Sequence, residues 1–187
     1  MNTYRTEPAR TGKSGRARLS RPSVVIAVIS LVAGVISGGV AYLGRSPRRQ
    51  EYVEGTAAIW QHMVVFGLAA LVAVVVVRRT HDNPMRLLLR PLGSAAARRL
   101  GHTVRSVPRH PTALLRLVLA LVPLGMLVFL PFRCGVQILG GLDPNFTVNA
   151  WGGPTYLGAM LFHYLDAVLL VAAAAGLLNL LLLRDEN

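Results

Sequence analysis

The chain has 187 residues, of which 53% are hydrophobic, and it carries a formal net charge of +12. A soluble domain of this length spreads its apolar residues in short periodic runs, whereas here long uncharged apolar blocks alternate with short arginine-rich connectors. This segregation is typical of a multi-pass membrane protein, and it makes the charge a topology signal, with no nucleic acid expected as a partner.

The chain begins with a polar, basic segment over residues 1–22, which contains six lysine or arginine side chains. Such a segment buries too little apolar surface to fold, so we expect a disordered cytoplasmic tail. The remainder, residues 23–187, contains every apolar block and is expected to form a single transmembrane domain.

The first apolar block covers residues 24–43, about the length needed to cross the hydrocarbon core of a bilayer. Ser30, Gly34 and Gly38 recur at every fourth position, and such a strip lets two helices approach closely in lipid. A basic start and small residues at 39–41 also fit a cleaved signal peptide, so cleavage of this helix stays open.

The second apolar block covers residues 55–77 and is ended by two arginines. The connector that follows, 78–111, contains eight arginines and a single acidic residue. Leu and Ala between these arginines predict one or two short interfacial helices, lying on the cytoplasmic side of the membrane. We expect the anionic inner leaflet of the lipid bilayer to be the partner of this loop.

The third apolar block covers residues 112–132, and Pro123 near its centre predicts a kink because it lacks a backbone donor. Residues 133–154 contain many turn-forming residues but also apolar ones, so we expect an outer loop that folds back onto the bundle. The fourth block covers residues 155–183. The four blocks together predict an all-α membrane protein, a four-transmembrane-helix bundle.

Basic residues are distributed unequally between the two sides of this predicted bundle. Fifteen lie in the tail, in the long connector or after the last block, whereas four lie on the opposite side. The positive-inside rule therefore places both termini in the cytoplasm, with the protein in the plasma membrane. Because Lys13 is the only lysine, we interpret the arginine-rich composition as that of a GC-rich bacterial genome.

Three ionisable residues, His62, His163 and Asp166, fall inside the apolar blocks, where a charge is costly. Counting 1.5 Å per residue from the helix ends places all three in the outer half, at similar depth. His163 and Asp166 are three positions apart and share one helix face. One structural interpretation is a hydrogen bond or ion pair between His62 and Asp166, worth about 1 kcal/mol. A second structural interpretation is that some of these residues lie at the outer interface and contact water.

The same cluster also fits functional interpretations, none of which has a specific spacing behind it. Two histidines on different helices suit a b-type haem, and with an aspartate they suit a divalent metal or a proton relay. The sequence has no Walker loop and no HExxH or GxSxG motif.

We therefore expect a non-enzymatic accessory or assembly subunit without a cofactor. Its partner would be a second membrane protein or another copy of the chain, contacted through the first helix or the outer loop. A haem, metal or proton-handling protein built on the polar cluster is the alternative.

Overall fold

The computed structural model describes residues 20–80 and 93–183, and every regular element in those ranges is a helix. In chain order the helices are α1 (Arg21–Leu43), α2 (Ile59–Thr80), α4 (Ser94–Ser106), α5 (Pro111–Gly140), α6 (Pro144–Thr147) and α7 (Tyr156–Leu181). Helices α1, α2, α5 and α7 are long and apolar enough to cross a membrane. The chain is thus a helical multi-pass membrane protein with four candidate spans; most of the predicted tail lies outside the described residues.

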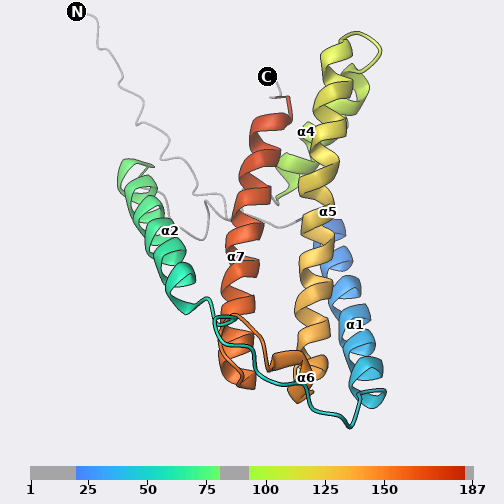
Figure 1. The fold of residues 1–187 in the computed structure, drawn as a ribbon. Coiled ribbons are helices and arrows are strands. Elements are labelled where there is room, and N and C mark those ends of the chain that lie inside the picture. The colour runs from blue at the N-terminus through green and yellow to red at the C-terminus, as the bar shows by residue number, and fades with distance from the viewer. Residues whose placement is uncertain (1–19, 81–92, 184–187) are drawn as a thin grey trace, which may run out of the picture.

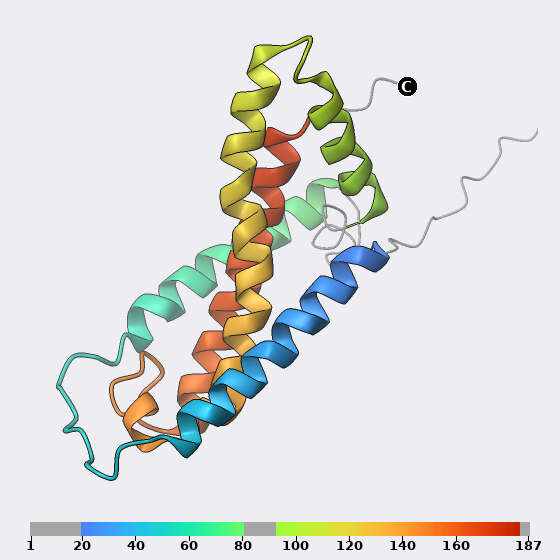
Figure 2. The same cartoon turned by 90° about the vertical axis from the view of Figure 1, so that its right-hand side faces the viewer.

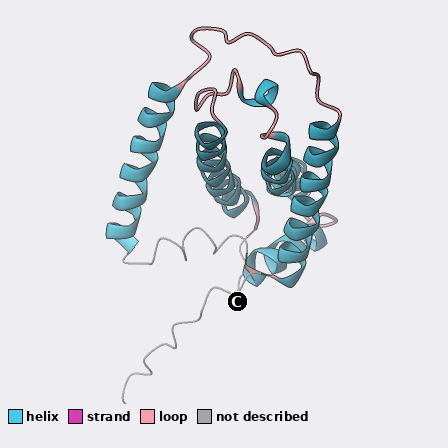
Figure 3. Ribbon diagram, turned by 90° about the horizontal axis from the view of Figure 1, so that it is seen from below, coloured by secondary structure: helices cyan, strands magenta, loops and turns pink. Residues whose placement is uncertain are grey.

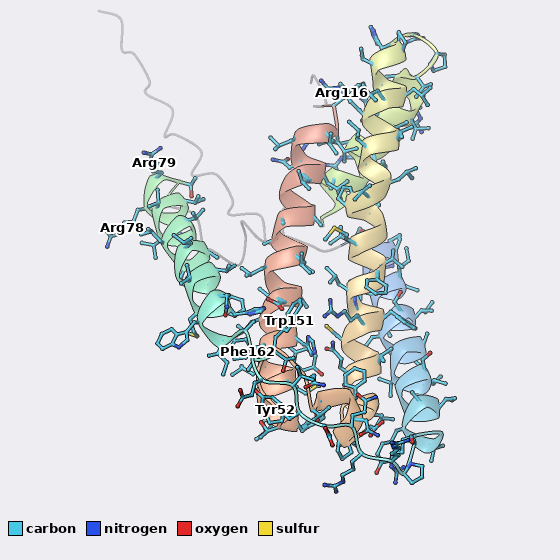
Figure 4. All side chains as sticks on the ribbon, viewed as in Figure 1. Tyr52, Arg78, Arg79, Arg116, Trp151 and Phe162 are labelled. Carbon is cyan, nitrogen blue, oxygen red and sulfur yellow. The ribbon has the colours of Figure 1, made fainter. Side chains whose placement is uncertain are left out.

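The two ends of the molecule differ in character. Figure 4 shows Arg78, Arg79 and Arg116 toward one end and Tyr52 and Trp151 toward the other. We call the first the basic end. The second, where residues 44–58 and 141–155 connect the helices, is called the loop end.

Helix α5 is the centre of the fold, with α1 and α7 packed against it (Figures 1 and 2). Glycines bring α1 and α5 into backbone contact: a Cβ atom at Gly34 or Gly38 would overlap backbone atoms of α5. On the other side of the contact, a Cβ at Gly135 would overlap backbone atoms of α1. The small-residue strip of α1, in which Ser30 is half-buried, is therefore filled by α5 of the same chain.

Helix α2 stands apart from the other three spans, as the views in Figures 1 and 3 agree. None of its residues is buried, although its mean hydropathy is that of a spanning helix. Its ring and ion-pair contacts with the other described helices and connectors involve His62 and Phe66, near its first turns at the loop end. The four spans thus form a packed group of three and one outlying helix.

The third span does not end at Phe132 as the sequence predicts, but continues to Gly140, so residues 133–140 belong to a helix. The physical reason is that no turn-forming pair occurs before Gly140-Gly141, and a single arginine does not stop a helix. The helix runs through Pro123 and Pro131, and the kink at Pro123 stays a prediction. Helix α2 begins at Ile59, later than residue 55.

At the basic end, α4 docks on the end of α7. The guanidinium of Arg99 donates to the carbonyl oxygens of Asn179, Leu182 and Leu183. Carbonyls in the last turn of a helix have no partners within the helix, and a cation there also complements the helix dipole. Helix α4 lies in the described part of the connector predicted to hold one or two helices; its placement on a leaflet stays a prediction.

Candidate functional site

Two of the three polar residues singled out in the sequence meet at the loop end. His62 comes from α2 and Asp166 from α7, and Nε2 of the histidine lies 3.3 Å from Oδ2 of the carboxylate. Their side chains are 13% and 17% exposed. Nδ1 of His62 lies 2.7 Å from the carbonyl oxygen of Ala58, one turn earlier in the chain. The ring is thus held by its own helix and presented to α7.

The hydrogen-bonding roles of the His62 ring follow from the positions of its atoms. Nδ1 faces a carbonyl oxygen, which can only accept, so Nδ1 donates and Nε2 is the ring atom presented to the carboxylate of Asp166. The 3.3 Å separation is within ion-pair range, and Oδ2 has no hydrogen-bond partner among the described residues.

Aromatic rings enclose His62 on several sides. Its ring centroid lies 5.1 Å from that of Trp151, 5.4 Å from that of Phe162 and 5.9 Å from that of Phe66. Figure 4 shows Trp151 and Phe162 on the side of the bundle that faces the first turns of α2. These contacts and the pair with Asp166 join α2 to the bundle.

His163 has a different partner, which sequence reasoning missed. Nη2 of Arg133 on α5 lies 3.3 Å from Nδ1 of His163. The sequence predicts that the third span ends at residue 132, which assigns Arg133 to the loop. The signal that identifies it is the lack of turn residues before Gly140. His163 and Asp166 lie one turn apart on α7 and share one helix face, so the two pairs are neighbours.

Gln137 is the second residue that sequence reasoning missed, because only ionisable residues had been considered. It lies one turn beyond Arg133 on α5, is 3% exposed, and its Oε1 has no hydrogen-bond partner among the described residues. Arg133, Gln137 and His163 line one cavity of about 460 Å³. A buried amide without a partner is costly, since it loses water and gains no hydrogen bond.

The cavity is covered by a roof, formed by residues 141–155, that two asparagines tie to the other connector. Oδ1 of Asn145 accepts from the backbone N–H of Gln50 at 2.8 Å, and its Nδ2 donates to the carbonyl of Arg48 at 3.0 Å. Oδ1 of Asn149 accepts from the N–H of Val53 at 2.9 Å. The two asparagine side chains therefore fix both connectors at the loop end through hydrogen bonds to backbone groups.

The roof is also packed against α7. A Cβ atom at Gly152 would overlap the carbonyl oxygen of Gly158, so the two backbones touch. Ala150 of the roof is buried together with Ala159 and Met160 of α7. This agrees with the apolar character that predicted a loop folded onto the bundle.

The geometry does not favour the haem and metal interpretations. Both ring nitrogens of His62 face protein atoms, and Nδ1 of His163 faces Arg133. Within the described ranges, no three His, Cys, Asp or Glu side chains are grouped so that they could hold a metal ion. The site contains the guanidinium of Arg133, the buried amide of Gln137 and the ring of His163, and all three line a partly aromatic cavity.

Comparison of the chain with protein-family models, curated proteins and solved structures finds no match.

Proposed function

We propose that this protein is a non-enzymatic accessory or assembly subunit of a bacterial plasma membrane, with its loop end outside and both termini in the cytoplasm. The distribution of basic residues supports this orientation, because fifteen lie on one side and four on the other. Arg78 and Arg79 of α2 and Arg116 of α5 lie toward the basic end (Figure 4), which is the end assigned to the cytoplasm.

The isolation of α2 is the observation that carries the proposal. Helices in lipid associate through close packing and polar contacts, because lipid chains are as apolar as their side chains. Helices α1 and α7 pack against α5 within the chain, whereas the ion-pair and ring contacts between α2 and the other described elements lie around His62. No residue of α2 is buried, and a spanning helix with so exposed an apolar surface suits packing against a helix of another membrane protein.

The paired state of the polar residues supports a non-enzymatic role. His62 faces Asp166, and His163 faces Arg133. The cluster has no hydroxyl or thiol nucleophile beside a histidine of the kind that covalent catalysis uses; in the part of the chain that the structure describes, the one cysteine is Cys134. These contacts hold helices and roof together.

Gly67 of α2 gives a sharp test, because a Cβ there would meet nothing within 4 Å in this chain. Gly67→Leu should therefore leave the fold intact and disturb only a helix packed from outside. Gly125→Leu is the matched control: that glycine lies on α5 and also has open space around it. We expect native electrophoresis of gently solubilised membranes to show a smaller complex for Gly67→Leu and an unchanged one for Gly125→Leu.

An unchanged complex in both variants, or a monomer already in the wild-type membrane, would contradict the proposal. If the complex contains only this chain, the partner is another copy. The proton-handling alternative is favoured by one observation, the 3.3 Å separation between Nε2 of His62 and Oδ2 of Asp166. A Soret band, bound metal or proton flux that is lost in His62→Ala would replace the accessory role with that alternative.

A further inference from the structure

The cavity under the roof has the dimensions of a ligand site. Its volume of about 460 Å³ falls in the range found for small-molecule pockets, roughly 300–1,000 Å³. Helix α5 supplies one wall, His163 of α7 another, and Trp151 and Phe146 of the roof contribute aromatic surface. Phe146 and Trp151 remain 41% and 49% exposed, so the site is open to the side rather than enclosed.

Two polar groups of the cavity lack suitable partners among the described residues: Arg133 has no carboxylate beside it, and Oε1 of Gln137 has no hydrogen-bond donor. No carboxylate of the described residues lies within ion-pair distance of Arg133; the ion pair found there joins His62 to Asp166. Arg133 faces only a histidine nitrogen, which leaves most of its five donors for another group. Gln137, 3% exposed and without a hydrogen-bond partner at Oε1, faces the same cavity.

Arg133 and Gln137 converge because of their spacing. Residues four positions apart are neighbours on one helix face, so the guanidinium and the amide point to the same region. An anion would satisfy the charge of Arg133, and a hydroxyl beside it would donate to Oε1 of Gln137. The buried, unpartnered amide therefore indicates a ligand that is anionic and carries a hydroxyl.

The cavity changes from polar to apolar along α5. Gln137 and Arg133 lie nearer the loop end, whereas Phe129 lies one further turn toward the membrane centre, about 6 Å deeper than Arg133. Phe129 is 54% exposed and continues the cavity wall onto the lipid-facing surface of α5. This polarity matches a lipid in the leaflet at the loop end, with its headgroup above and its chains below.

We propose that the cavity binds one anionic lipid of that leaflet, of the phosphoglycerol type. Its phosphate is held by Arg133, a headgroup hydroxyl is held by Gln137, and its acyl chain lies on Phe129. His163 positions the Arg133 guanidinium from the opposite wall.

The chain contains a reporter for this site, because Trp151 lines the cavity and the other tryptophan, Trp60, is 81% exposed on α2. In a Trp60→Phe background, Trp151 fluorescence is measured in nanodiscs of phosphatidylcholine. A small fraction of phosphatidylglycerol or phosphatidylcholine is added with brominated acyl chains, which quench on contact. We expect the brominated anionic lipid to quench at about a tenfold lower fraction, the effect of a charge-assisted hydrogen bond.

Arg133→Gln should abolish this preference, whereas Arg49→Gln, which removes an exposed cation at the same end, should preserve it. Gln137→Glu is a second test that does not depend on losing Arg133. This substitution places a carboxylate one turn from Arg133, where it can pair with the guanidinium. The protein should therefore stay folded and still lose the preference for the anionic lipid. Equal quenching by both lipids would overturn the proposal, as would an equal loss in the Arg49 and Arg133 variants. A response of Trp151 to inorganic phosphate in lipid-free detergent would assign the site to a soluble anion instead.

Discussion

At the scale of single residues, four ionisable groups inside the spans form two pairs, each between two helices. His62 of α2 faces Asp166 of α7, and Arg133 of α5 faces His163 of α7. A lone charge at the centre of a bilayer costs roughly 2.5–3.5 kcal/mol on the insertion scale. Each pair offsets part of that cost and at the same time fixes the helices that it joins.

Removing one member of the His62–Asp166 pair should destabilise the protein more than removing both. His62→Leu leaves a carboxylate that is 17% exposed without its partner, and we expect a loss of about 1–3 kcal/mol in the free energy of unfolding. The double variant His62→Leu with Asp166→Leu should recover part of that loss. Reversible unfolding in detergent, analysed as a double-mutant cycle, measures the coupling.

If the free-energy losses of the two single variants simply add in the double variant, the direct pair is contradicted. The control is Leu165→Ala, which changes a neighbouring, lipid-exposed position of α7 and should show no coupling with His62→Leu.

Part of this site could be predicted from the sequence, and the reason is geometric. Depth along a helix follows from residue number, so counting placed His62 and Asp166 at one level, and the structure has them in contact. The partner of His163 could not be found in this way, because Arg133 was assigned to a loop. Gln137 has no charge, so its cost appears only when burial and hydrogen bonding are known.

At the scale of elements, hydropathy identified the spans but not their contacts. Four long apolar blocks predict four helices, and the described residues contain four helices long and apolar enough to cross a membrane. A strip of glycines predicts that another helix packs closely against this one, but it does not identify that helix. In this chain α5 fills that role through its own Gly135, a residue that the sequence analysis had placed beyond the end of the third helix.

Gly34→Leu should separate α1 from α5, because even a Cβ at that position would overlap the backbone of α5. Overpacking of a tight contact typically costs 1–3 kcal/mol, and we expect a loss of about 3 kcal/mol in the free energy of unfolding. Gly125→Leu introduces the same side chain into open space on α5 and should be close to neutral. Equal stability of the two variants, measured by thermal unfolding in the same detergent, would contradict the α1–α5 contact.

At the scale of the whole molecule, the chain consists of a three-helix bundle, an outlying helix α2 and a roofed polar site at the loop end. Asn145 and Asn149 bind the connector that leads into α2, so the site and the outlying helix share one support. The proposed orientation, with the loop end outside and the basic end in the cytoplasm, decides which leaflet supplies the proposed lipid.

Cysteine accessibility tests that orientation most directly. Cys134 is replaced by serine, and a single cysteine is introduced at Ser46 in the loop-end connector or at Arg109 near the basic end, both exposed positions. A membrane-impermeant maleimide should label Ser46→Cys in intact cells and label Arg109→Cys only after the membrane is opened. Labelling of Arg109→Cys in intact cells, with protection of Ser46→Cys, would contradict the account.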